Sequence, residues 1–117
     1  MTTEATVYLV EDDEAVRDSL QMVLESVGHK VVSYSRADTF LEDYSIDMAG
    51  CMVLDIRMPG MNGMELQRQL NTRNSILPII FVTGHGDVPM AVDAMQRGAV
   101  DFVQKPYREE ELLGKIQ

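Results

Sequence analysis

The sequence predicts an α/β fold, in which helices cover both faces of a parallel sheet of five strands. Five short apolar runs alternate with five segments in which apolar residues recur at helical spacing, and the connections between them are short. Such alternation is typical of strand-helix-strand units, which place successive strands in one parallel sheet. With 117 residues, 45% of them apolar and 25% charged, the chain has enough material for one hydrophobic core. We therefore expect a single domain over residues 1–117.

The first part of the chain predicts two strands, each followed by a helix. Thr6–Val10 is β-branched, aromatic and apolar, as expected for a strand buried on both faces. In the segment after it, apolar residues fall on one helical face, and Gly28 stands where a helix commonly ends. Lys30–Tyr34 predicts the second strand. The Ser-Arg-Ala-Asp pattern at 35–38 then predicts the cap of a helix that runs to about Tyr44.

The middle of the chain contains an apolar run that ends in a single acid. Cys51–Leu54 predicts the third strand, and Asp55 follows it directly. Proline, glycine and asparagine predict a loop over residues 59–63, and Met64–Leu70 predicts the third helix. Pro78–Thr83 predicts the fourth strand, with proline at its first position, where a missing N–H is tolerated.

The last part of the chain repeats the pattern. Met90–Gln96 predicts a helix that ends before Gly98, and Val100–Gln104 predicts a strand that Lys105 and Pro106 terminate. Glu109–Ile116 predicts a fifth helix with acids in its first turn, where the helix dipole favours them. This helix has only about two turns before the sequence ends. We therefore expect it to be truncated and the chain to be part of a longer protein.

The composition excludes several kinds of function. The net charge of −9 argues against nucleic-acid contact by this domain, because such binding relies on lysine and arginine meeting phosphates. A single cysteine, Cys51, leaves no internal disulfide and no metal-binding cysteine pair. We see no export leader and no apolar run of about 18 residues, so we expect a cytoplasmic protein without a membrane segment.

Polar residues at the ends of four predicted strands indicate one shared site. Parallel strands bring their carboxyl ends to the same edge of a sheet, where ligands bind. Glu11 and Asp12 follow the first strand and Asp55 follows the third, so three carboxylates would meet there. Like charges about 4 Å apart repel by roughly 4 kcal/mol per pair at an effective dielectric of about 20, so a cation is required. An all-oxygen site suits Mg²⁺ or Mn²⁺ better than zinc.

The remaining two strand ends complete a site suited to phosphoryl transfer. Lys105 supplies a fixed positive charge and Thr83 a hydroxyl donor, while Gly84 leaves room for an incoming group. Metal, lysine and hydroxyl donors recur around transferred phosphoryl groups. A carboxylate can accept such a group covalently, and Asp55 is the candidate acceptor.

These motifs, taken together and in order, resemble the receiver domain of bacterial two-component response regulators. The shared pieces are the acids after the first strand, the Leu-Asp-Ile-Arg-Met-Pro-Gly run at 54–60 with Asn-Gly at 62–63, Thr-Gly at 83–84, and Lys-Pro at 105–106 before an aromatic residue. The resemblance covers essentially the whole chain. It implies a flavodoxin-like (βα)5 fold with strand order 2-1-3-4-5. The stretch 84–92 is similar to regulators of the FixJ-like (NarL/LuxR-type) and dicarboxylate-transport kinds.

The resemblance implies a role for each site residue and a set of partners. The implied roles are phosphoacceptor for Asp55, direct metal ligand for Asp12, water-mediated ligand for Glu11, main-chain ligand for Arg57, phosphoryl-binding lysine for Lys105, and a switch pair for Thr83 and Tyr107. The implied partners are a sensor histidine kinase and a C-terminal DNA-binding effector domain, either a helix-turn-helix domain alone or an ATPase with a DNA-binding domain. A homodimer through the fourth helix, fifth strand and fifth helix is also implied.

Three alternatives remain open from the residues themselves. The working acid pair is Glu11 with Asp12 or Asp12 with Asp13, and we favour the first because Asp13 suits a helix start. A metal-dependent phosphatase with an aspartyl nucleophile would want a second carboxylate two residues after Asp55, where Arg57 stands. A flavodoxin-like binding module would want a phosphate-cradling loop in place of the acids. We expect a phosphoacceptor switch, which catalyses only its own phosphorylation and dephosphorylation, and not a turnover enzyme.

Overall fold

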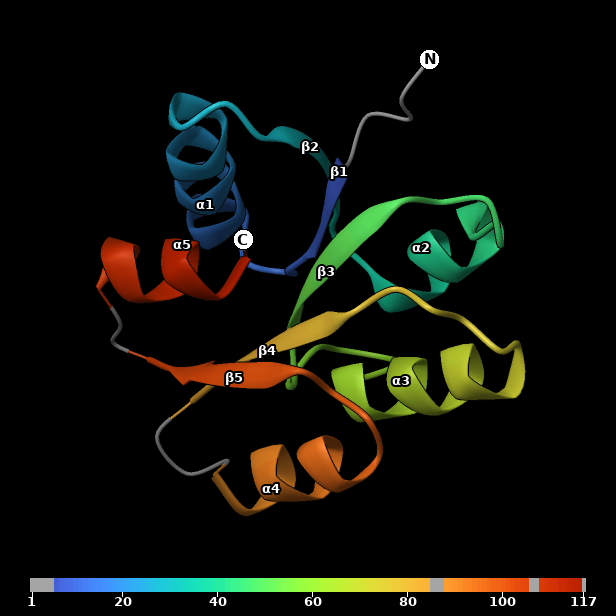
Figure 1. Cartoon of the computed structure of the whole chain (residues 1–117). Helices are drawn as coiled ribbons and strands as arrows, with labels where there is room; N and C mark the ends of the chain where they lie inside the picture. The colour runs from blue at the N-terminus through green and yellow to red at the C-terminus, as the bar shows by residue number, and fades with distance from the viewer. Residues whose placement is uncertain (1–5, 85–87, 106–107, 117) are drawn as a thin grey trace.

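The computed structural model describes residues 6–84, 88–105 and 108–116, and these form a five-stranded parallel sheet with five helices (Figure 1). The strand order is β2-β1-β3-β4-β5, which confirms the predicted fold. The strands are β1 (Thr6–Val10), β2 (Lys30–Tyr34), β3 (Gly50–Asp55), β4 (Ile79–Thr83) and β5 (Asp101–Gln104). The helices are α1 (Glu14–Ser26), α2 (Ala37–Asp43), α3 (Gly63–Thr72), α4 (Val88–Gln96) and α5 (Glu109–Ile116).

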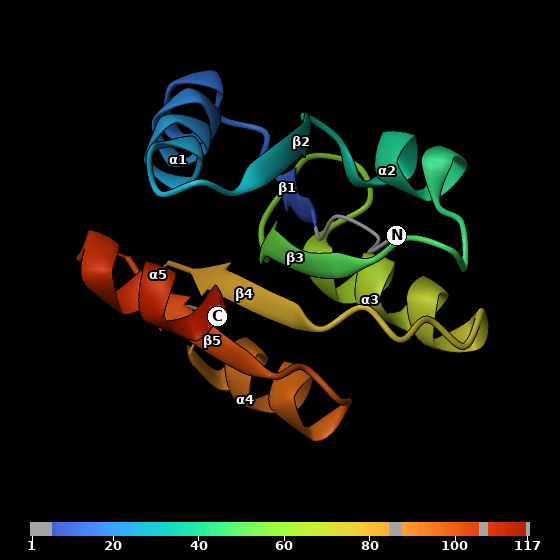
Figure 2. The ribbon, with the colours of Figure 1, turned by 45° about the horizontal axis from the view of Figure 1, so that its top comes forward.

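Alternating side chains of the central strands divide the core between the two faces of the sheet. On β1, Tyr8 and Val10 join a cluster with residues of α2, α3 and α4, whereas Val7 and Leu9 join a second cluster with residues of α1 and α5. Figures 1 and 2 show these helices in their two layers. Since both faces are covered, the central strands are apolar almost throughout, and polar side chains gather at the strand ends.

Most predicted boundaries are confirmed to within two residues, but the predicted cap of α2 is wrong. The N-cap is Arg36, with no hydrogen bond from its side chain. The carboxylate of Asp38 accepts from the side-chain Nε of Arg36 at 2.9 Å and from the main-chain N–H of Thr39 at 2.9 Å. A local ion pair therefore replaces the predicted capping box.

Two other boundaries differ in a way that matters for the site. The strand β3 extends to Asp55 itself, because its residues pair with β4 as far as the Asp55 and Val82 register. The helix α4 begins at Val88, two residues before the predicted start.

No helix in the described part of the chain is both long and apolar enough to cross a membrane.

Candidate functional site

The predicted site residues that the structure describes lie at one edge of the sheet, where the carboxyl ends of β1, β3, β4 and β5 meet. Val10 pairs with Leu54, so Glu11 leaves β1 beside Asp55, the last residue of β3. Thr83 is the last residue of β4. Lys105 follows β5, and its main-chain N–H donates to the carbonyl of Thr83 at 2.7 Å. The parallel register therefore brings together side chains that lie far apart in the sequence.

Three carboxylates form the centre of this site. Glu11, Asp12 and Asp55 each place a carboxylate oxygen within 4.8 Å of the others. Glu11 and Asp55 are buried, with 2% and 7% of their surfaces exposed, whereas Asp12 is exposed. Burial raises the pKa of Glu11 to about 8, with further increases from its hydrogen bond to Asp55 and from repulsion by that carboxylate. The three residues together offer an all-oxygen donor set of the kind that fits Mg²⁺.

A lysine balances part of this negative charge. The Nζ of Lys105 lies 3.6 Å from Oδ2 of Asp55 and 3.9 Å from Oε2 of Glu11. Its attraction opposes the rise in the pKa of Glu11. The Lys105 side chain is 34% exposed, so its ammonium group stands between the buried acids and solvent. It is therefore placed to contact both Asp55 and any anionic group attached to it.

The hydroxyl of Thr83 is buried beside these charges. The residue has 0% of its surface exposed, and its Oγ1 has no hydrogen-bond partner among the residues that the structure describes. A buried hydroxyl without a partner costs free energy, roughly 1–3 kcal/mol. It is consequently available to bind a group that enters the site. The other predicted switch residue, Tyr107, lies outside the described residues.

The loop after β3 holds Asp55 in place. The main-chain N–H of Arg57 donates to Oδ1 of Asp55 at 3.3 Å. Gly63, at the start of α3, donates its N–H to the carbonyl of Ile56 at 2.9 Å. A Cβ atom at Gly63 would lie only 2.3 Å from the main-chain oxygen of Asp55. Sequence reasoning treated this glycine as part of a loop and missed its close approach to the acceptor. The predicted metal contact of the Arg57 carbonyl stays a prediction.

The loop after β1 separates the three consecutive acids into two roles. Asp13 is the N-cap of α1, where its Oδ1 accepts from the N–H of Val16 at 3.1 Å. The acidic group found among the described residues contains Glu11 and Asp12 but not Asp13. The geometry groups Glu11 and Asp12 with Asp55, and the assignment of these two acids as the working pair stays a prediction.

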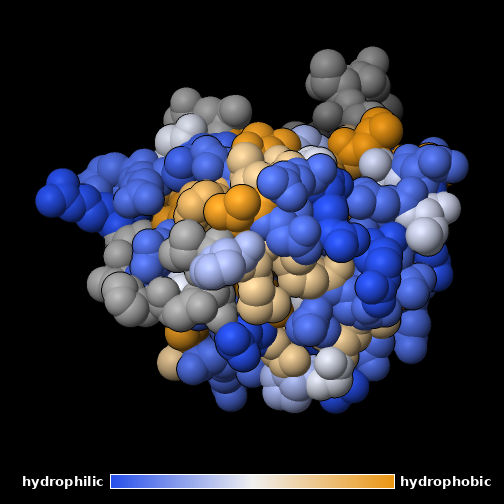
Figure 3. Space-filling model, turned by 90° about the horizontal axis from the view of Figure 1, so that it is seen from below, coloured by the Kyte–Doolittle hydropathy of each residue, from blue (hydrophilic) through white to orange (hydrophobic). Residues whose placement is uncertain are grey.

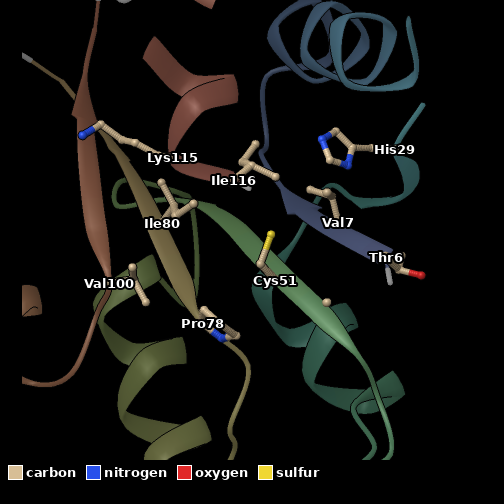
Figure 4. Close-up of a pocket in the computed structure, with 10 residues that line it drawn as sticks. Thr6, Val7, His29, Cys51, Pro78, Ile80, Val100, Lys115 and Ile116 are labelled. Atoms are coloured by element: carbon tan, nitrogen blue, oxygen red, sulfur yellow. The ribbon is translucent and has the colours of Figure 1, made fainter. Parts of the chain in front are cut away.

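A cavity of about 370 Å³ opens at the opposite edge of the sheet (Figure 4). It is lined by residues at the amino ends of β1, β3 and β4, including Thr6, Cys51 and Ile80, and by Ile116 at the end of α5. Burial raises the pKa of the Cys51 thiol, so the thiol stays protonated. Because this cavity lies at the amino ends of the strands, it belongs to a different part of the fold from the acidic site.

The fold and the four strand ends define a receiver domain, and comparison with known proteins agrees. Residues 7–117 match the family described as response regulator receiver domain, so the chain belongs to this family. It is 49% identical over 113 residues to the response regulator protein TodT of Pseudomonas putida, covering 97% of this chain and 50% of TodT. It is 44% identical over 117 residues to the transcriptional regulatory protein FixJ of Bradyrhizobium diazoefficiens, covering 100% of this chain and 57% of FixJ.

A solved structure gives the same result. The crystal structure of FixJ-N superposes with a TM-score of 0.90 at 43% identity, covering 98% of this chain and 92% of that one. The predicted family and its FixJ-like kind are therefore confirmed. The chain spans only about half the length of the curated relatives reported above.

Proposed function

We propose that the chain is a phosphoacceptor switch in a phosphorelay, which takes a phosphoryl group from a sensor histidine kinase onto Asp55. The observation that carries this proposal is the environment of Asp55. Its carboxylate is buried at the end of β3, with two further acids within 4.8 Å and an ammonium group 3.6 Å away. Such a carboxylate is held in place and can bind a cation, and the nearby ammonium group can contact a phosphoryl group attached to it.

In the proposed transfer, an Oδ atom of Asp55 forms a bond to phosphorus while the bond from phosphorus to the donor nitrogen breaks. The nitrogen leaves with the electron pair. Lys105 binds a phosphoryl oxygen, and the hydroxyl of Thr83 donates to another. Asp12, Asp55 and the main-chain carbonyl of Arg57 would hold Mg²⁺, with Glu11 acting through water. When bound, the metal neutralises charge on the phosphoryl oxygens.

The phosphorylated state is proposed to change the surface formed by α4, β5 and α5, over residues 88–115. Converting a 1:99 balance of two states into 99:1 requires about 5.5 kcal/mol. Hydrogen bonds to a charged group contribute about 1.5–3 kcal/mol each, so Thr83 and Lys105 together supply much of this difference. Tyr107 is proposed to fill the space that Thr83 leaves. Later hydrolysis of the aspartyl phosphate by the domain itself would reset the switch.

The same surface is the proposed homodimer interface. Figure 3 views the molecule from the side of α4 and shows apolar side chains grouped among hydrophilic ones. Val92 of α4 is 48% exposed, and Met90, Met95 and Phe102 are partly buried nearby in the core cluster. We propose that dimerisation through this surface controls a DNA-binding effector domain in the full-length protein. The relative named FixJ is a transcriptional regulatory protein, which supports an effector of this kind.

The decisive experiment uses a small phosphodonor. The protein is incubated with acetyl phosphate and Mg²⁺, and intact mass spectrometry follows the addition of one phosphoryl group that is labile in both acid and base, as an acyl phosphate is. Wild type and the control Asp47→Asn, an exposed loop position, are expected to gain it, whereas Asp55→Asn is not. Chelation of Mg²⁺ is expected to abolish the gain. Full modification of Asp55→Asn would reject the proposed acceptor.

The same experiment distinguishes the alternatives. A phosphatase would release inorganic phosphate from many phosphoesters over repeated turnovers, and a flavodoxin-like binding module would gain no mass. The structure gives no support to the phosphatase, because the position two residues after Asp55 contributes its main-chain N–H and carries no second carboxylate.

A further inference from the structure

Arg17 of α1 reaches back to the loop that carries the two site acids. Its Nη1 donates to the main-chain carbonyl of Glu11 at 2.9 Å and lies 3.5 Å from that of Asp12. The side chain is half-buried at the base of the helix. The guanidinium group therefore contacts two consecutive peptide units whose side chains belong to the acidic cluster.

The two ends of this loop are held by other contacts, and the carbonyl groups between them are held by Arg17. At its start, the N–H of Glu11 donates to the carbonyl of Tyr34 on β2 at 3.0 Å. At its end, Asp13 caps α1 and its N–H donates to Oε1 of Glu11 at 3.2 Å. Among the contacts described for this loop, the peptide oxygens between these two ends accept from the guanidinium group. Orientation of these peptides sets the direction in which the two carboxylates project.

We propose that Arg17 is a positioning residue for the metal site: by holding the carbonyls of Glu11 and Asp12, it keeps their carboxylates directed toward Asp55. This proposal rests on the proposed Mg²⁺ site. Groups that orient metal ligands without touching the metal commonly contribute 10–100-fold to metal affinity. Arg17 acts on the ligands from the main-chain side, so it does not occupy the space between the carboxylates.

The direction of the change in Mg²⁺ affinity when Arg17 is replaced distinguishes a positioning role from a purely electrostatic one. Arg17 carries a positive charge near a site for a cation, so loss of this charge alone would strengthen Mg²⁺ binding. Loss of the two carbonyl contacts would instead weaken binding, because the free loop presents its carboxylates in more than one orientation. Positioning and charge therefore predict opposite changes when Arg17 is replaced by a neutral residue of similar length.

The test is a Mg²⁺ titration of the whole chain, followed by the amide NMR shifts of the site residues. Arg17→Met removes the donors and keeps an unbranched apolar stem, and Arg17→Lys keeps the charge but loses the planar fork. Arg73→Met, an exposed position at the end of α3, is the matched control for loss of one charge. We expect the Kd for Mg²⁺ to rise roughly 10-fold in Arg17→Met, to rise less in Arg17→Lys, and to stay unchanged in Arg73→Met.

Thermal unfolding in EDTA gives the second measurement. An unchanged or lower Kd in Arg17→Met, whether or not its unfolding temperature falls, overturns the proposal, because a purely structural residue would lower stability without weakening Mg²⁺ binding. If Arg17→Met does not fold, Arg17→Lys decides: a Kd equal to wild type overturns the proposal and a higher one supports it. Absence of Mg²⁺ binding in wild type would reject the proposed metal site itself, which is a different outcome.

Discussion

Replacement of Lys105 by methionine tests the charge balance of the site directly. The ammonium lies 3.6 Å from a carboxylate oxygen of Asp55 and 3.9 Å from one of Glu11. At an effective dielectric of about 20, each contact corresponds to roughly 4–5 kcal/mol of Coulomb attraction, and to only about 1 kcal/mol in bulk water. The lysine side chain is 34% exposed, which places it between these limits. Methionine keeps the apolar stem and removes the charge.

We expect Lys105→Met to lower the free energy of unfolding by about 1–3 kcal/mol when Mg²⁺ is absent, since the variant leaves buried acids without their lysine. We expect the same change to strengthen Mg²⁺ binding, because the ammonium and the metal compete for the same carboxylates. Urea unfolding in EDTA and in Mg²⁺ measures both effects. The difference in stability between wild type and variant should shrink as Mg²⁺ is added.

Lys115→Met is a suitable control. Lys115 forms an ion pair with Asp101 at 2.8 Å, away from the acidic cluster, and this pair holds the pKa of Asp101 below its ordinary value. Its removal is expected to change stability equally with and without Mg²⁺. An equal loss in both buffers for Lys105→Met, or a weaker response of that variant to Mg²⁺, would refute the proposed competition.

Three further predictions concern Glu11, Gly63 and the buried amide of Gln67. Because the folded state raises the pKa of Glu11 from 4.5 to about 8, stability in EDTA should fall as pH rises through this range, and Glu11→Gln should flatten the profile in urea unfolding. Gly63→Ala should lose about 1–3 kcal/mol of stability and phosphorylate slowly with acetyl phosphate, since its Cβ would meet Asp55. In thermal unfolding, Gln67→Ala should lose about 2 kcal/mol or more of stability, because it leaves a cavity. Gln67→Leu should change stability little, because it removes a buried oxygen that has no hydrogen-bond partner among the described residues, and the carbonyl of Ala94 still accepts from two main-chain N–H groups.

The fold was predictable because apolar patterning decides it. Strands such as Thr6–Val10 are nearly all apolar and are buried at every position, which is expected where both faces of the sheet are covered. Because a helix lies between each strand and the next, successive strands run parallel, and parallel strands place Asp55, Thr83 and Lys105 at one edge of the sheet. The convergence of the site therefore follows from the order of the elements, without knowledge of any side-chain contact.

Contacts between polar groups on different elements were not predictable in the same way. Gln67 lies on α3, and its Nε2 donates to the carbonyl of Ala94 on α4 at 3.0 Å. In the sequence, nothing distinguishes this residue from a glutamine on the surface of a helix. Arg17 likewise resembles a solvated arginine of an exposed helix. The approach of Gly63 to Asp55 had one available signal, the Asn-Gly pair at the start of α3, where Asn62 caps the helix by accepting from the N–H of Glu65.

The charges of the site are consistent with the proposed phosphorylation switch as well as with the proposed metal site. With all groups ionised, three carboxylates and the ammonium of Lys105 leave two net negative charges, which one divalent cation neutralises. A phosphoryl group on Asp55 replaces one negative charge by about two, so the neutral site becomes negative again. We propose that the buried hydroxyl of Thr83 donates to this new negative charge and that β4 shifts toward the phosphoryl group when it does so. In the proposed switch, phosphorylation of Asp55 therefore favours a position of β4 in which Thr83 donates to the phosphoryl group, and this shift would couple the chemistry at Asp55 to the surface of α4 and β5.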